Sequence, residues 1–435
     1  MTSGKFSFLV TADFKPLPYW WDAAPRAAAE HPPLPSRTDV AIIGSGITGL
    51  LAALKLARSG RQVVVLDQGD LGIGASTRNA GYISRVLKNS FSDIVAAKGL
   101  DKAIELYRGT MEAFDTVLRI VREEQIECGF VQCGRFSAAT SPKHYDALAR
   151  ELELRRRYLG EPFEMVSRAE QHRQIATEYW HGGVVFPQLA ALHPGLYHQG
   201  LLDRARAAGT ALHANTRVLG VHREGDDIVV QTSRGGLLAR DVIIATNGYT
   251  GPATPWLQRR VLPFNAFMVA TEPLSTELVR RVLPSSRTVV EFVRNGVFVR
   301  QSPDGTRILF GGHTGRPTAE PLDVAPALQR TLGKLLPDLA KTRLSHAWTG
   351  RCAGTWDLYP HIGQHDGIHF AMGYCFAGVP MASYMGGKLA ARILGRSDAA
   401  TPFDDLTFPS VPLYGAVSHL TPYLLRYWEW RDSMA

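Results

Sequence analysis

The sequence predicts an α/β chain with two interleaved domains (an α+β arrangement), one built on a parallel sheet and one on an antiparallel sheet. Three observations predict this fold. A strand, a glycine-rich turn and a helix follow one another from Asp39. Apolar strands recur in the middle and near the end of the chain, and short strands with Asn-Gly and Asp-Gly turns fill residues 262–312. With 435 residues, the chain is long enough for two domains and a substantial core.

The first element is a strand that enters a glycine turn. The apolar run 40–43 leads into a turn and then a helix, and three glycines punctuate this turn: Gly44, Gly46 and Gly49. A second strand ends at Asp67. In such a unit the glycines let the backbone turn tightly and approach a pyrophosphate, and the acid about 20 residues further on accepts a ribose hydroxyl. The pattern predicts a Rossmann-like dinucleotide site and leaves open whether the nucleotide is FAD or NAD(P).

The remaining elements follow from periodicity and turn residues. Apolar residues at helical spacing predict helices, in order, over 92–98, 101–124, from about 142, 193–208, 326–335 and 381–394. Apolar runs predict strands over 211–223, 227–232, 241–245, 292–301, 308–310 and 368–372. We expect a loop over 348–367.

The order of these elements predicts a discontinuous domain arrangement. Residues 1–38 are rich in proline and aromatic residues and are expected to form an ordered, extended N-terminal arm. The dinucleotide-binding domain is expected to collect three segments: 39–90, 165–250 and 346–400. The substrate domain is expected to contain two others, 91–164 and 251–345, and residues 401–435 form a C-terminal tail.

Composition argues against several classes of protein. The formal net charge is +8, but the arginines are scattered and no basic block is interleaved with aromatic residues, so we expect no nucleic-acid partner. The cluster 155–157 is interpreted as a solvated helix face. No apolar run reaches the ~20 residues that a membrane span needs. Four cysteines without CxxC spacing, and no secretory signal pattern, predict a cytoplasmic protein with free thiols.

A metal site is not expected either. His361, His365 and His369 are spaced by four, which would place them on one face of a helix. The intervening Pro360 and Gly363 argue against a helix here.

Several later segments resemble a known family. They are Gly74-Ala-Ser-Thr-Arg-Asn-Ala-Gly81, Asp241-Val-Ile-Ile-Ala-Thr-Asn-Gly248, Trp348-Thr-Gly with Asp357-x-x-Pro-x-Ile-Gly363, and Met372-Gly-Tyr-Cys-Phe-Ala-Gly-Val379. Together with the glycine turn they resemble the D-amino-acid-oxidase-type FAD-dependent oxidoreductases, such as the glycine and sarcosine oxidases, over nearly the whole chain. The segment 19–24 and the tail 409–432 are most similar to the γ-glutamylputrescine oxidase-like subgroup.

The resemblance implies which residues hold FAD. The residues expected at the pyrophosphate are Gly44, Gly46, Ile47, Thr48 and Gly49, and those at the adenosine ribose are Asp67 and Gln68. The isoalloxazine or ribityl chain would meet Ala75, Ser76, Arg78, Asn79, Ala80, Gly81 and Tyr82. Val218 would meet the adenine, Thr246 and Gly248 the nucleotide, and Gly378 and Val379 the pyrimidine edge at a helix N-terminus.

The resemblance also implies a reaction. The enzyme would oxidise a C–N bond of an amine or N-substituted amino acid by hydride transfer to flavin N5, giving an imine that hydrolyses, and oxygen or another acceptor would reoxidise the flavin. Candidate substrate contacts are His313, Trp348, Arg351, Cys352, Tyr359 and Tyr374, for each of which a packing role is equally plausible. The alternatives are an NAD(P)-linked dehydrogenase or a non-catalytic flavin-binding subunit of a larger complex.

Three departures from the family pattern matter. Cys352 stands where the arginine that binds the substrate carboxylate is expected, and neighbouring Arg351 is expected on the opposite face of its strand. This favours a secondary amine or N-substituted compound over a free α-amino acid. Gly350 stands where sarcosine oxidases attach flavin covalently, so noncovalent FAD is expected. Leu309 replaces a lysine linked to oxygen reactivity. Arg300, in a strand before a hairpin turn, could pair with an anionic end of the substrate but is interpreted as a surface charge. Substrate identity, electron acceptor, stereochemistry and oligomeric state stay open.

Overall fold

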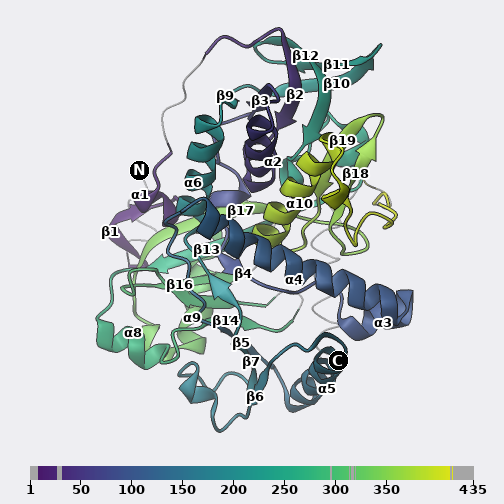
Figure 1. Cartoon of the computed structure of the whole chain (residues 1–435). Helices are drawn as coiled ribbons and strands as arrows, with labels where there is room; N and C mark the ends of the chain where they lie inside the picture. The colour runs from purple at the N-terminus through teal and green to yellow at the C-terminus, as the bar shows by residue number, and fades with distance from the viewer. Residues whose placement is uncertain are drawn as a thin grey trace.

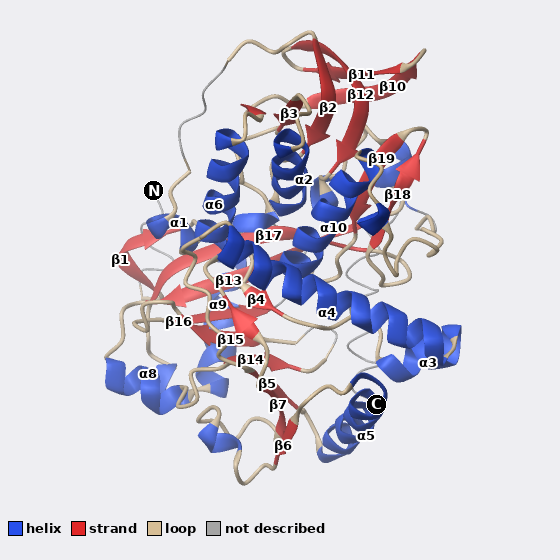
Figure 2. Ribbon diagram, in the orientation of Figure 1, coloured by secondary structure: helices blue, strands red, loops and turns tan. Residues whose placement is uncertain are grey.

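The computed structural model of the chain describes residues 8–26, 32–293, 296–312, 314, 318, 320–411 and 414. These residues fold around two large sheets, of eight and nine strands. In the view of Figures 1 and 2 the eight-stranded sheet occupies the upper part of the molecule and the nine-stranded sheet the lower part. Helix α4 (Leu100–Glu123) runs across the middle of this view. The mixture of parallel and antiparallel sheets confirms the predicted fold class.

The eight-stranded sheet carries the glycine turn. Its parallel core follows the order β9, β3, β2, β12 and β19, with bounds Ala211–His213, Val63–Leu66, Arg37–Ile43, Gly235–Ile244 and Ile368–Met372. Antiparallel strands extend it, namely β10 (Val218–Glu224), β11 (Asp227–Thr232) and β18 (His361–His365). The central strands read as continuous apolar runs because both faces of the sheet are covered.

Helices cover one face of this sheet. They are α2 (Ile47–Arg58), α6 (Pro194–Ala207) and α10 (Gly378–Ile393), and α4 packs on α10. Helices α2 and α10 approach closely at Gly386, where a Cβ atom would lie 2.5 Å from the carbonyl oxygen of Thr48. This contact packs the start of α2 against the middle of α10.

The nine-stranded sheet is mostly antiparallel. In spatial order it contains β1 (Val10–Lys15), β17 (Leu344–Gly354), β13 (Leu262–Thr271), β16 (Ile308–Gly312), β15 (Phe298–Gln301), β14 (Thr288–Glu291), β5 (Arg135–Ala138), β7 (Gly183–Phe186) and β6 (Glu164–Val166). Helices α8 (Thr276–Val282) and α9 (Pro321–Leu335) bury apolar side chains in the core that this sheet shares. The Asp304-Gly305 turn joins antiparallel β15 and β16, as predicted.

The remaining elements are short or peripheral. They are α1 (Trp20–Ala23), α3 (Phe91–Lys98), α5 (Pro142–Leu159), α7 (Pro255–Gln258) and a small sheet of β4 (Tyr82–Ile83) with β8 (Ala190–Ala191). Serine caps set the starts of α3 and α5, because Ser90 and Ser141 accept hydrogen bonds from backbone amides three residues on.

The secondary structure differs from the expectations at one place. The expected loop 348–367 is wrong, because most of it forms the end of β17 and all of β18. Strands β6 and β7 pair within the nine-stranded sheet, as does β17. The expected domain division grouped residues 165–250 and 346–400 with the dinucleotide-binding domain. These domain boundaries stay a prediction.

The N-terminal arm contacts both the nine-stranded sheet and the loop 74–82. Strand β1 pairs in parallel with β17, at the edge of the nine-stranded sheet. Trp20 is fully buried, and its Nε1 donates to the carbonyl of Asn79 at 2.8 Å. The arm therefore holds the loop 74–82, which comes after β3, in place.

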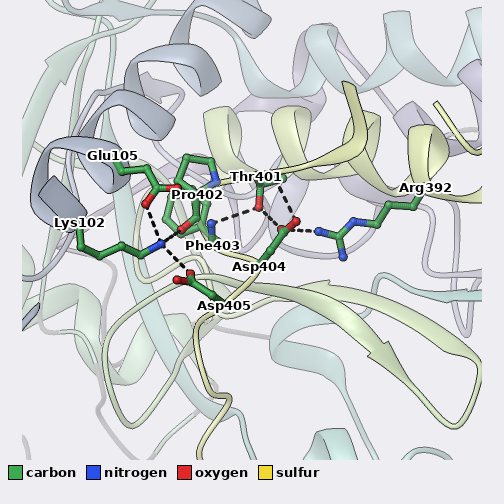
Figure 3. A network of polar contacts seen from close by, with 8 residues as sticks. All are labelled: Lys102, Glu105, Arg392, Thr401, Pro402, Phe403, Asp404 and Asp405. Atoms are coloured by element: carbon green, nitrogen blue, oxygen red, sulfur yellow. Dashed lines mark hydrogen bonds and ion pairs between the residues drawn. The ribbon is translucent and has the colours of Figure 1, made fainter. Parts of the chain in front are cut away.

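The segment after α10 is also anchored (Figure 3). Lys102 on α4 donates to the carbonyl of Pro402 at 2.9 Å, and Arg392 on α10 pairs with Asp404. Between these contacts the Phe403 ring is fully buried. Residues 401–405 thus join α4 to α10, and the predicted tail beyond residue 414 lies outside the described residues.

Two arginines that were expected on the surface are buried. In the cluster 155–157 of α5, Arg156 and Arg157 are exposed as expected, but Arg155 is 1% exposed and pairs with Glu161 at 2.5 Å. Arg300 is 5% exposed, and its Nη1 donates to the carbonyls of Ala80 and Leu192 at 2.8 and 2.9 Å. None of the helices in the described parts of the chain combines the length and apolar character needed to cross a membrane.

Candidate active site

A single cavity of about 880 Å³ has walls from both large sheets. We call its two parts the dinucleotide end, at the glycine turn, and the sheet end, at the nine-stranded sheet. Most of the predicted FAD contacts line it: Gly44, Gly46, Ile47, Thr48, Asp67, Gln68, Ala75, Ser76, Arg78, Asn79, Ala80, Tyr82, Val218, Thr246, Gly378 and Val379. Their roles as cofactor contacts stay predictions, but the fold brings these distant segments to one space.

The dinucleotide end is shaped by backbone. Gly44 has φ +108°, and a Cβ atom there would lie 2.8 Å from the carbonyl oxygen of Ala245. A Cβ atom on Gly49 would lie 2.0 Å from the carbonyl oxygen of Gly44. Side chains are therefore excluded from the turn, and the N-terminus of α2 opens on the cavity, with the amide of Ile47 donating to Ser76 Oγ at 3.0 Å.

Asp67 closes this turn from the next strand. Its Oδ2 accepts from the amide and hydroxyl of Ser45 at 2.9 and 2.6 Å, and its Oδ1 accepts from the amide of Gly69 at 3.2 Å. Burial raises the pKa of Asp67, and these hydrogen bonds oppose the rise. The carboxylate is thus fixed at the cavity wall beside the glycine turn.

Sequence reasoning missed a residue behind the turn. His198 of α6 is fully buried, and its Nε2 lies 2.8 Å from the carbonyl oxygen of Ser45. Burial lowers the pKa of His198 to about 4, so the ring is neutral at physiological pH. The sequence contains no motif that would connect residue 198 with the turn.

These features fit an adenine dinucleotide. The backbone cradle has no room for a Cβ atom, a helix N-terminus faces the cavity, and a fixed carboxylate lies at the end of the second strand. Together they suit a pyrophosphate and the neighbouring ribose. The cavity then extends from this cradle to the nine-stranded sheet.

The loop 74–82 connects the two ends of the cavity. Arg78 donates from Nε to the carbonyl of Ile73 at 2.7 Å and from Nη1 to the carbonyl of Thr349 at 2.9 Å. Trp348 Nε1 donates back to the carbonyl of Arg78 at 2.9 Å. The Arg78 guanidinium therefore serves mainly to fix the loop against β17.

The turn before α10 forms another wall. Cys375 and Phe376 have φ values of +46° and +74°, which is unusual for residues with side chains. Such backbone strain costs on the order of 1–3 kcal/mol per residue and often occurs at functional sites. Tyr374 Oη lies 2.7 Å from Thr48 Oγ1, which joins this turn to α2. The starts of α2 and α10 are thereby held at one cavity.

The candidate substrate contacts do not all reach the cavity. Cys352 and Tyr374 line it, whereas Trp348 and Tyr359 are buried outside its wall. Arg351 is exposed, in agreement with its expected place on the other face of β17. His313 lies outside the described residues. The catalytic roles of all six stay predictions.

Three predicted cofactor contacts also lie outside the cavity wall: Gly49, Gly81 and Gly248. A Cβ atom on Gly81 would lie 2.1 Å from the carbonyl oxygen of Leu192, and one on Gly248 would lie 2.6 Å from that of Cys352. These glycines permit close packing behind the wall.

Sequence reasoning also missed most of the sheet end. Side chains from strands far apart in the sequence line it, namely Arg135, Ser137, Phe186, Ala266, Met268, Val290 and Phe298. They share a face only because of strand register. His361 and His365 lie on β18 and His369 on β19, and the part of the chain that the structure describes has no cluster of potential metal ligands.

Comparisons with known proteins agree with this geometry. The family model of the DAO-type FAD dependent oxidoreductases matches residues 39–392. The chain belongs to this family. It is an FAD-dependent oxidoreductase, and nothing in the comparisons supports the NAD(P) alternative.

Relatives and solved structures extend the match over nearly the whole chain. The chain is 29% identical to the probable oxidoreductase OrdL of Rhizobium meliloti (strain 1021), covering 90% of this chain and 92% of that protein. It is 28% identical to the gamma-glutamylputrescine oxidoreductase of Escherichia coli (strain K12), covering 91% and 93%. The crystal structure of glycine oxidase from Geobacillus kaustophilus has the same fold, with a TM-score of 0.74, 22% identity, and coverage of 87% of this chain and 99% of that one.

Proposed function

We propose that this FAD-dependent enzyme oxidises a C–N bond of an amine or an N-substituted amino acid. One observation carries the proposal: the cavity is continuous from the dinucleotide cradle to a largely apolar face of the nine-stranded sheet. A substrate on that face would meet the cofactor without crossing bulk solvent. The names of the relatives, a gamma-glutamylputrescine oxidoreductase and a glycine oxidase, support amines and amino acids as the substrate class.

FAD supplies the hydride acceptor when bound. The protein contributes position and environment. Met268, Val290 and Phe298 form an apolar wall at the sheet end. Such a wall disfavours an ammonium ion by desolvation, so it favours the neutral amine that C–N oxidation requires.

The wall at Cys352 is also uncharged. Burial raises the pKa of this thiol to about 12, so it stays protonated at neutral pH. We therefore assign Cys352 to the cavity wall and not to acid–base chemistry. Proton transfer from the substrate would then go to water or to a group on another strand.

We further propose that FAD is held noncovalently and that the protein acts in the cytoplasm. Gly350 offers no side chain for covalent attachment on β17. All four cysteines are free thiols, which suits a reducing compartment. Oxygen or another acceptor would complete the cycle.

Anaerobic reduction tests the function. The FAD-loaded enzyme is mixed with secondary amines, N-substituted amino acids, and free D- and L-amino acids, and flavin absorbance near 450 nm is followed. We expect an amine or N-substituted compound to bleach the flavin faster than any free α-amino acid. A panel in which no compound bleaches the flavin would favour the non-catalytic subunit. Acid precipitation of the same sample should leave the yellow colour in solution, and colour in the pellet would contradict noncovalent binding.

A further inference from the structure

The sheet end contains a buried cation that forms no ion pair with a carboxylate within the described part of the chain. Arg135 of β5 lines the cavity and is 6% exposed. Its Nε donates to Thr288 Oγ1 at 3.4 Å, which is a long hydrogen bond. Its Nη2 is buried and has no hydrogen-bond partner among the residues that the structure describes.

The other two buried arginines each have a carboxylate or backbone partner that Arg135 lacks. Arg155 has the carboxylate of Glu161 at 2.5 Å, and Arg300 donates to two backbone carbonyls. Burying a guanidinium without an anion or a full set of acceptors is unfavourable. Burial lowers the pKa of Arg135 to about 10, which still leaves it a cation at neutral pH. This arrangement is therefore incomplete until an acceptor enters.

Aromatic rings surround the guanidinium. Its Cζ lies 5.0 Å from the centre of the Tyr82 ring, and the Tyr82 and Phe298 rings are 6.0 Å apart. The register places Phe186 directly opposite Arg135, and all three rings line the cavity. The walls beside the cation thus suit the hydrocarbon part of a ligand.

Arg135 lies far across the sheet from Cys352. Strand β5 is separated from β17 by β13, β16, β15 and β14. Five strand spacings of about 4.8 Å correspond to a path of about 24 Å along the sheet. A ligand that reaches from the wall at Cys352 toward Arg135 must therefore be extended.

We propose that Arg135 binds a carboxylate at the distal end of an extended substrate whose amine is oxidised within the same sheet end of the cavity, toward Cys352 on β17. The substrate part of this inference rests on the proposed function and narrows it to amines that carry a remote carboxylate. A guanidinium pairs with a carboxylate through two parallel hydrogen bonds, which would satisfy the free Nη2. Arg135 on β5 thus supplies a positive charge that β17 does not supply at Cys352.

A matched pair of ligands tests the site without turnover. The probes are 4-phenylbutyrate and its neutral analogue 4-phenylbutanamide, and binding to the FAD-loaded enzyme is measured by calorimetry. We expect the unmodified enzyme to bind the carboxylate about tenfold more tightly than the amide. Arg135→Gln should abolish this preference while leaving amide binding unchanged, and Arg135→Lys should keep part of it.

Arg173→Gln is the control, because the side chain of Arg173 is 69% exposed and the residue lies outside the cavity wall. It should leave both dissociation constants unchanged. Equal binding of the two probes by the unmodified enzyme would overturn the proposal, even if the Arg135 variants fail to fold. An equal loss of both probes in Arg135→Gln, with normal flavin absorbance, would reduce Arg135 to a packing role and would also overturn it.

The test of the anion site and the test of the proposed function can fail independently of each other. If no amine bleaches the flavin but the carboxylate preference disappears in Arg135→Gln, the anion site stands and amine oxidation fails. If amines bleach the flavin and the preference is absent, the anion site fails alone. A substrate found in the anaerobic panel adds a further readout, because Arg135→Gln should raise its KM with little change in kcat.

Discussion

The two ends of the cavity are built in different ways. At the dinucleotide end, the backbone of the short glycine turn forms the cradle, and side chains are excluded at Gly44 and Gly49. At the sheet end, side chains from six strands meet because their registers place them on one face. The first kind of site tolerates almost no change in its residues. The second kind can change its ligand by a single substitution, because each side chain adds its own chemical group to the wall.

The largest effect is expected from Gly49→Ala at the dinucleotide end. The added Cβ atom would overlap the carbonyl oxygen of Gly44, since the two would be 2.0 Å apart, and the helix must move away from the strand. We expect a loss of about 3 kcal/mol in the free energy of unfolding and weaker FAD retention. Urea unfolding and the ratio of absorbance at 450 and 280 nm measure the two effects.

Gly60→Ala is the matched control for this variant. Gly60 has a positive φ of +80°, which Gly49 does not have, and no atom lies within 4 Å of the added Cβ. Gly60→Ala should cost only about 1 kcal/mol, from backbone strain, and should keep FAD. A loss in Gly49→Ala no larger than that in Gly60→Ala would contradict the expected effect of the close approach at the turn.

A pH-dependent effect of similar size is expected behind the same turn. His198 Nε2 faces the carbonyl oxygen of Ser45, and Nδ1 lies 3.3 Å from Arg26 Nη1. The ring must therefore donate from Nε2 and accept at Nδ1, which requires the neutral form. Burial lowers the pKa of His198 to about 4, below the unfolded value of about 6.5.

The sign of the effect follows from this shift. Because the unfolded chain takes up a proton first, the stabilisation is complete above about pH 6.5 and is lost as pH falls toward 4, by about 3 kcal/mol in all. Urea unfolding at pH 7, 6 and 5 should show the decrease, and His198→Gln should reduce its slope. His193, whose pKa is also lowered to about 4 by burial, should leave a residual slope. If the free energy of unfolding of His198→Gln falls with pH as steeply as that of the unmodified protein, His198 is not the group responsible.

The same contrast explains what the sequence could reveal. The glycine turn, the acid at Asp67 and the strand before Thr246 are local patterns with a fixed physical meaning, and the structure places all of them at one cavity. The resemblance to the family added the loop 74–82 and the turn before α10. These segments work through backbone, so short motifs carry their information.

The sheet end was not predictable in the same way. Arg135 stands in a short strand without any motif, and only pairing with Thr288 and Phe186 brings it to the cavity. Arg300 and Arg155 were expected on the surface because a single charged residue gives no sign of burial. The expected loop 348–367 failed because its glycines and proline resemble turn signals, whereas long β17 is stabilised by pairing with β13 along its whole length.

The smallest effect is expected at Cys352, on the wall where the family pattern would place an arginine. Burial raises the pKa of this thiol to about 12 and that of Cys375 to about 11, so both resist alkylation at pH 8. Cys352→Ala should change the rate of anaerobic flavin bleaching by less than about threefold, equivalent to ~0.6 kcal/mol. Cys133→Ala, outside the cavity wall, is the control. Iodoacetamide labelling followed by peptide mass analysis should modify Cys133 before Cys352. Rapid labelling of Cys352, or a large loss of rate in Cys352→Ala alone, would contradict this prediction. Either result would show that Cys352 on β17 takes part in the chemistry, and it would weaken the proposal that Arg135 on β5 supplies the polar group of the sheet end.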